Sequence, residues 1–121
     1  VGPGHTVTAL YAVRTEPGAR GHLATATVRW LDPETRDPHE ETGDLEADAL
    51  HDSLRAAPSR FQVTAVAAYF ADALRSRDDL PGAPAGLAEL ADHARVLSDT
   101  TEDGAVRELA RAIERAGRQR D

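Results

Sequence analysis

The chain has 121 residues, which is the size of one domain with a single modest core. Its formal net charge of −7 argues against nucleic acid or an anionic membrane as the main partner, because phosphate binding needs a basic patch. The absence of cysteine excludes disulfides, thiolate metal sites and cysteine nucleophiles, and no apolar run approaches the roughly 20 residues that cross a bilayer.

The first predicted element is a β-strand over residues 4–13, which contain no Pro, Asp or Asn after Gly4 and are rich in β-branched side chains. One face would carry Val7, Ala9, Tyr11 and Val13. The other face is not purely polar, so we interpret the segment as an inner strand covered on both sides.

A turn over residues 16–21, with one proline and two glycines, leads to a second predicted strand over residues 22–31. Its sequence alternates between apolar and polar side chains and predicts a hairpin with the first strand. Trp30, the only tryptophan, offers the largest single burial. Residues 38–45 could add a third, exposed edge strand, although Gly43 and the carboxylates there have poor strand propensity.

From about residue 45 the apolar spacing changes to the period of a helix. Residues 47–55 predict a short helical turn, and three longer helices follow at about 59–77, 84–97 and 102–116. Ser59 and Gln62 have capping-box spacing, and Gly117 can end the last helix. We therefore predict one α+β domain over residues 1–121. A small antiparallel sheet of two or three strands (1–45) is followed by three main helices packed on it (46–121), the first of them laid across the sheet.

The sequence offers few ligands for a metal ion. None of the histidines shows the spacing of a zinc site, and although His5 and His22 could meet across the first hairpin, two histidines alone do not make a metal site. Residues 99–104 resemble a calcium loop in part, but they lack the terminal bidentate Glu and suit helix capping better. We predict no metal and no cofactor.

An acidic segment at residues 39–44 is the nearest approach to a catalytic group, because Glu40, Glu41 and Asp44 could serve acid–base chemistry beside His39. The stretch is polar and contains Gly43, so we expect its carboxylates to be solvated. No serine has a Gly-x-Ser-x-Gly setting and no Gly-rich phosphate loop occurs, so we predict that the chain is not an enzyme.

Two blocks of sequence carry a family resemblance. Residues 4–11 read Gly-His-Thr-Val-Thr-Ala-Leu-Tyr, and residues 59–70 read Ser-Arg-Phe-Gln-Val-Thr-Ala-Val-Ala-Ala-Tyr-Phe, followed by Leu74-Arg75-Ser76. This pattern resembles the C-terminal domain of unknown function that follows the von Willebrand factor type A (VWA) module in bacterial proteins. The exclusive use of Arg over Lys, with abundant Ala, indicates a GC-rich genome, and the absence of Met leads us to expect a piece of a larger protein.

The resemblance implies a non-catalytic accessory or protein-interaction domain, outside the cytoplasm at the cell envelope, whose partner is the VWA module and the segment before it. The VWA metal motif Asp-x-Ser-x-Ser is absent from this chain, so any such metal would belong to that neighbour. Because an isolated hairpin is marginal, we expect the first strand, or the second, to add to a sheet formed by that preceding segment and so to clasp the module. The residues predicted to interact are His5, Thr6, Thr8, Leu10, Tyr11 and Trp30.

Three alternatives stay open. A small ligand-binding or hydrolase-like domain could use residues 39–44. The exposed strand edge could bind another protein or pair two copies in a homodimer. In the simplest alternative, residues 38–45 form the missing edge strand and the chain needs no partner.

Overall fold

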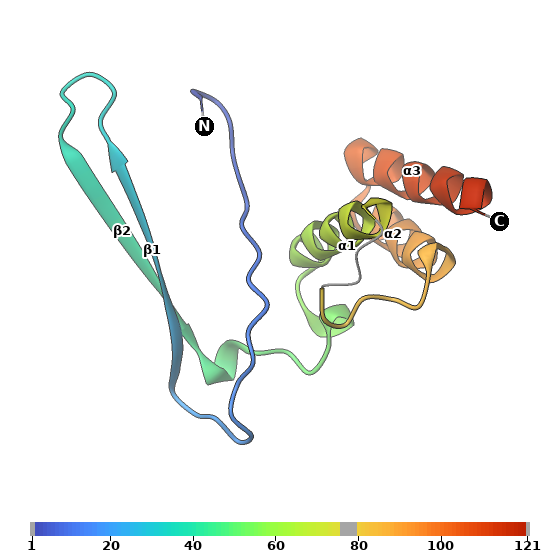
Figure 1. Cartoon of the computed structure of the whole chain (residues 1–121), viewed down its shortest axis with the longest axis horizontal. Helices are drawn as coiled ribbons and strands as arrows, with labels where there is room; N and C mark the ends of the chain where they lie inside the picture. Colours follow the sequence, from blue (N-terminus) through green and yellow to red (C-terminus); the bar gives the residue numbers. More distant parts are fainter. Residues whose placement is uncertain (1, 76–79, 121) are drawn as a thin grey trace. The chain divides into compact units, whose positions relative to one another are not determined.

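The computed structural model describes residues 2–75 and 80–120. Two strands, β1 (His22–Leu31) and β2 (Pro38–Glu46), are followed by the short 3-10 turns η1 (Ala47–Ala49) and η2 (Leu54–Ala56). Three helices complete the described chain: α1 (Ser59–Leu74), α2 (Leu87–Thr101) and α3 (Gly104–Arg120) (Figure 1). The predicted α+β class, with a small antiparallel sheet first and three helices after it, is confirmed.

The sheet is a two-stranded antiparallel ribbon in which β1 and β2 lie side by side (Figure 1). The register pairs His22 with Glu46 at one end, shifts between His22 and Ala24, and then runs regularly from Ala24 with Leu45 to Leu31 with Pro38. Asp32 organises the connecting turn, because its Oδ1 accepts hydrogen bonds from the backbone N–H groups of Glu34 (2.8 Å) and Thr35 (2.9 Å), which also lowers the pKa of this carboxyl. The third strand predicted at residues 38–45 is confirmed.

The strand predicted at residues 4–13 is wrong, and so is its hairpin with residues 22–31. The segment has no strand structure, and β1 is paired with β2 instead. The physical reason is that alternating apolar and polar residues allow a segment to form a strand, but they do not determine which other segment it pairs with. The six residues between β1 and β2 form a compact turn that places β2 beside β1.

The described chain divides into two compact units. One is Val13–Asp52, which holds the ribbon. The other comprises the described residues of Val1–Ala12 and Ser53–Asp121, and contains the helices.

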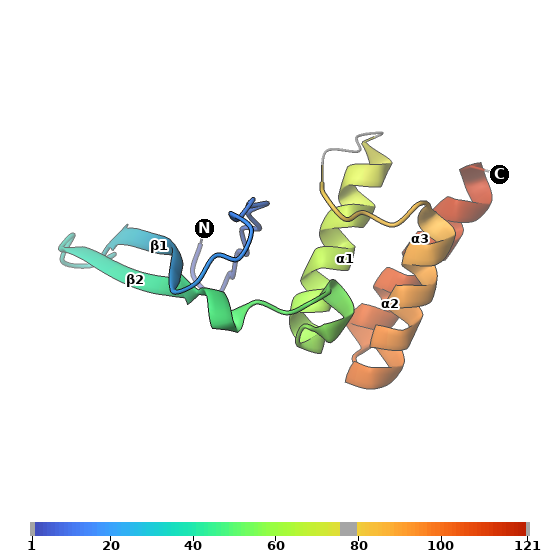
Figure 2. The ribbon, with the colours of Figure 1, turned by 90° about the horizontal axis from the view of Figure 1, so that it is seen from below.

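The helical unit has its own hydrophobic core, built where α2 packs against both α1 and α3 (Figure 2). The apolar residues of α2 recur three or four positions apart, so they form one continuous stripe that faces the other two helices. The buried core residues are Val66 of α1, Leu90, Ala91, Ala94 and Leu97 of α2, and Val106, Ala110 and Ile113 of α3.

Two predicted helix ends are wrong. α2 continues past Leu97 to Thr101, and the hydroxyls of Thr100 and Thr101 donate to backbone carbonyls one turn earlier. α3 continues through Gly117 to Arg120, because a glycine ends a helix only where the chain adopts a left-handed conformation, and Gly117 keeps helical geometry. The end predicted at residue 77 for the first long helix lies outside the described residues.

The junction between α2 and α3 confirms the capping interpretation of residues 99–104. Glu102 adopts a left-handed conformation (φ 51°) and ends α2, and the Oδ1 atom of Asp103 then accepts the backbone N–H of Ala105 at 2.8 Å. The other carboxylate oxygen of Asp103 accepts from Arg60 Nη1 at 2.7 Å, which connects the first turn of α1 to the start of α3. The Arg60 hydrogen bond, followed by that from Ala105, lowers the pKa of Asp103.

Candidate functional site

The residues predicted to interact fall into two places. His5, Thr6, Thr8, Leu10 and Tyr11 lie in the segment before the ribbon, where all are exposed and none belongs to a strand. Tyr11 is 81% exposed and Val7 is 73% exposed, so these apolar side chains have no cover in the described chain. Trp30 lies in the ribbon unit.

The ribbon has two unlike faces because strand side chains alternate. We call the first the apolar face. It carries Ala24, Ala26, Val28 and Trp30 of β1, and opposite them Leu45, Gly43, Glu41 and His39 of β2. Val28 is 62% exposed and Trp30 is 45% exposed, which corrects the expectation that Trp30 supplies the largest burial.

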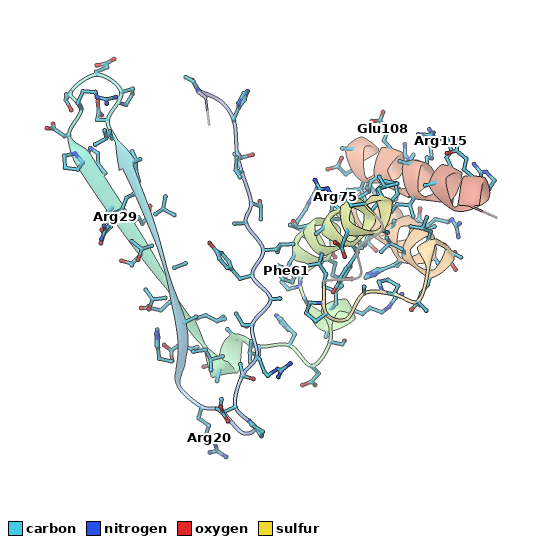
Figure 3. The ribbon with its side chains drawn as sticks, viewed as in Figure 1. Arg20, Arg29, Phe61, Arg75, Glu108 and Arg115 are labelled. Carbon is cyan, nitrogen blue, oxygen red and sulfur yellow. The ribbon has the colours of Figure 1, made fainter. Side chains whose placement is uncertain are left out.

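On the opposite face, which we call the polar face, side chains of β1 contact side chains of β2. Thr25 donates to Asp44 at 2.7 Å, and the Nδ1 atom of His22 lies 3.3 Å from Glu46 Oε1. Arg29, which projects outward from the ribbon in Figure 3, pairs with Glu40. Each carboxylate on this face thus has a cross-strand partner, which is what a solvent-facing ladder needs. His22 contacts Glu46 in the ribbon unit, whereas His5 lies in the other unit.

Near the turn, an open hollow is lined by residues from both strands. The Trp30 and His39 rings stack with centroids 5.6 Å apart and planes inclined by 21°, and they form one wall of it. Arg29 and Glu40 are the charged side chains of the lining, and Leu31 and Pro38 complete it. Glu41 and a second histidine, which an acid–base site in residues 39–44 would use, do not line this hollow.

Within residues 2–75 and 80–120, no three His, Asp or Glu side chains gather as ligands for a metal ion. The helices in this part of the chain are also too short or too polar to span a bilayer.

Sequence reasoning missed a buried polar cluster at the junction of α1 and α2. The side-chain Nε2 of Gln62 donates to the backbone carbonyls of Ala57 (2.7 Å) and Arg55 (3.2 Å), and its Oε1 lies 2.7 Å from His93 Nε2. Because Oε1 can only accept, His93 carries its hydrogen on Nε2. The predicted capping box is therefore wrong: Ser59 makes no capping bond, and Gln62 ties η2 to α2 instead.

The buried His93 should make the stability of the helical unit depend on pH. Burial lowers the pKa of His93 below 6.5, the charge of Arg55 lowers it further, and Glu89 opposes the shift. In the unfolded chain the imidazole binds its proton near pH 6.5, whereas the folded chain resists protonation. The contribution to stability is therefore complete above pH 6.5 and is lost as the pH falls below it, until the folded-state pKa is passed.

Urea unfolding at pH 7.5 and pH 5.5, followed by circular dichroism, measures this effect. The midpoint should be lower at pH 5.5, and the difference should shrink in His93→Leu but persist in His51→Leu, a matched change at an exposed histidine. Equal pH differences in all three proteins would contradict the assignment to His93.

No family model matches the chain, and neither a curated protein nor a solved structure matches it.

Proposed function

We propose that this chain is a non-catalytic accessory domain that binds protein partners by strand addition. Its segment at residues 4–13 would donate a strand to a sheet in the polypeptide that precedes a VWA module, and so clasp that module. The observation that carries the proposal is the exposed alternating segment, whose apolar side chains Val7, Tyr11 and Val13 have no cover in the described chain.

Strand addition suits this segment on two physical grounds. Its backbone N–H and C=O groups can form a ladder with a neighbouring edge, which gives affinity, while its alternating side chains give specificity. Covering one exposed side chain such as Val7 contributes about 1.5–3 kcal/mol. His5, Thr6, Thr8 and Leu10 would be buried or paired in the same strand.

The proposed partner follows from the resemblance at residues 4–11 and 59–70. It is a VWA module together with the segment before it, in a bacterial protein of the cell envelope. The net charge of −7 supports a protein partner over nucleic acid.

Amide hydrogen exchange tests the clasp. The VWA module with its preceding segment is added as a separate polypeptide to the isotope-labelled chain. We expect the amides of residues 6–13 to exchange rapidly in the chain alone and at least about tenfold more slowly in the mixture, because ladder formation protects them.

A charge on the donated strand should weaken that binding. Val7→Lys would place an ammonium in the buried interface, whereas the matched control Val96→Lys changes an exposed valine of α2. Equal binding by both variants, or unchanged exchange of residues 6–13 on mixing, contradicts the clasp.

A second candidate is a small ligand-binding or hydrolase-like domain, for which the open hollow beside Trp30 and His39 would be the site, although Glu41 and a second histidine do not line it. Hydrolysis of p-nitrophenyl acetate separates the two proposals. The accessory domain predicts nearly the same slow rate for the wild-type chain, His39→Gln and Glu40→Gln, the two side chains of the hollow that could act in acid–base chemistry. A rate that falls about 100-fold or more in either variant favours the hydrolase.

A further inference from the structure

We infer that the open edge of β1 is a self-association surface, through which two copies of the chain pair antiparallel, β1 against β1. In the described chain the sheet holds only β1 and β2, so each strand has one edge without a strand beside it (Figure 1). The inference deepens the proposed function, since both depend on strand addition, but it uses a different strand and a different partner.

The two edges of the ribbon differ in charge. β2 carries Glu40, Glu41, Asp44 and Glu46, so two β2 strands placed edge to edge would bring carboxylates close to one another. Proteins often prevent unwanted strand pairing by placing charged side chains on an edge strand. Pro38 also lacks the backbone N–H that a paired strand would donate. We call the edge of β2 guarded, because these charges and the proline oppose the addition of another strand.

From Ala24 to Leu31, beyond the register shift at Leu23, β1 has no such guard. Arg29 is its only permanently charged residue, and Ala24, Ala26, Val28 and Trp30 give it a nearly continuous apolar face. An unguarded and largely apolar edge that is regular over residues 24–31 is the kind that accepts another strand.

The register of the pair follows from the side chains. An antiparallel two-fold pair centred on Thr27 places both apolar faces on the same side of the new sheet, because residues of equal parity lie opposite one another. It pairs the regular part of β1, with Ala24 opposite Trp30 of the second copy at each end.

The same register matches the sizes and charges of opposing side chains. Trp30 lies opposite the small Ala24, Ala26 lies opposite Val28, and Arg29 lies opposite the neutral Thr25. Moving the centre to Arg29 would instead set two guanidinium groups against each other and shorten the overlap, which disfavours that register.

The second copy is the occupant that this pairing fits, because the result is a four-stranded sheet with guarded β2 strands at both outer edges. Three or more strands with a shared apolar face are stable where a lone hairpin is marginal. Val28 and Trp30, 62% and 45% exposed in one copy, would lie beside apolar side chains of the other.

Disulfide trapping tests the register, since the chain has no cysteine of its own. In Thr27→Cys the two thiols would face each other across the two-fold axis, within the roughly 4.5–5.5 Å Cβ separation of opposing strand residues. Thr42→Cys is the matched control, because Thr42 pairs with Thr27 on the same face but lies on the guarded strand. We expect Thr27→Cys to cross-link at least about tenfold faster under mild oxidant, because only that pair approaches the roughly 3.5–4.5 Å Cβ separation of a disulfide.

A charge swap tests the same contact without covalent bonds. Ala26→Lys combined with Val28→Lys, and Ala26→Glu combined with Val28→Glu, should each sediment as monomers, while an equimolar mixture should form the heterodimer. Equal cross-linking of Thr27→Cys and Thr42→Cys, or a wild-type chain that stays monomeric at millimolar concentration, overturns the inference. So does protection of the amides of residues 4–13 in a monomer, which would mean that the chain's own segment occupies the β1 edge.

The two proposals fail separately. Val7→Lys should leave the cross-linking of Thr27→Cys unchanged, and the lysine pair at positions 26 and 28 should leave binding of the VWA module unchanged. Loss of cross-linking alone therefore removes the β1 pair, and loss of module binding alone removes the clasp.

Discussion

Replacing Ile113 by alanine should destabilise the helical unit by about 2–5 kcal/mol, the usual cost of removing a large aliphatic side chain from a packed core. Ile113 of α3 is 0% exposed and lies in the cluster that joins the three helices. Its loss removes buried methyl groups and leaves a cavity that the neighbouring helices can fill only in part. Since a domain of this size is stable by only about 5–15 kcal/mol, the variant should unfold at a clearly lower urea concentration.

Helical circular dichroism during urea unfolding measures the change. The control is Val96→Ala, which removes an aliphatic side chain that is 56% exposed on α2 and should change the free energy of unfolding by less than about 0.5 kcal/mol. If Ile113→Ala does not fold, Ile113→Val should still fold and cost about 0.5–1.5 kcal/mol. A value for Ile113→Ala as small as that for Val96→Ala would show that this core does not hold the helices together.

Replacing Gln62 by leucine should have the second largest effect. The change keeps the volume nearly constant but leaves His93 Nε2–H and the carbonyls of Arg55 and Ala57 without their partner. A buried donor or acceptor without a partner costs about 1–3 kcal/mol, so we expect a loss of at least that size. The contact between η2 and α1 should loosen at the same time.

The matched control is Gln119→Leu, the same change at an exposed position of α3, which should be nearly neutral. A double-mutant cycle with His93→Leu sharpens the test. When both polar partners become apolar, the penalty of the orphaned imidazole disappears, so the double variant should lose less stability than the sum of the two single variants. Additive losses would mean that Gln62 and His93 are not coupled.

The helical core could be predicted from the sequence because its signal is local. Leu90, Ala91, Ala94 and Leu97 recur at the helix period, and so do Val106, Ala110 and Ile113 in the next helix, and the structure buries all of them. The exact ends of α2 and α3 could not be predicted, since Gly117 and Ser98 can either break or continue a helix, depending on what packs around them.

The sequence indicates which segments can form strands, but not which of those segments pair with each other. Residues 4–13 have the better strand composition, yet β1 pairs with residues 38–46, whose carboxylates argue against a strand. Cross-strand partners such as Arg29 for Glu40 and Thr25 for Asp44 offset that weak propensity, and they exist only once the register is set. His93 was missed for the same reason, because nothing near it in sequence shows that Gln62 will lie beside it.

The row of carboxylates on β2 also limits how large an assembly can become. A ribbon with two receptive edges could add copies at both sides without end, as strands do in a growing fibril. With one edge closed by like charges, each ribbon of the inferred β1 pair would have a single edge for binding, and growth would stop once two ribbons have met. Neutralising that row with amides, Glu40→Gln, Glu41→Gln, Asp44→Asn and Glu46→Gln, would turn a chain that pairs into one that polymerises.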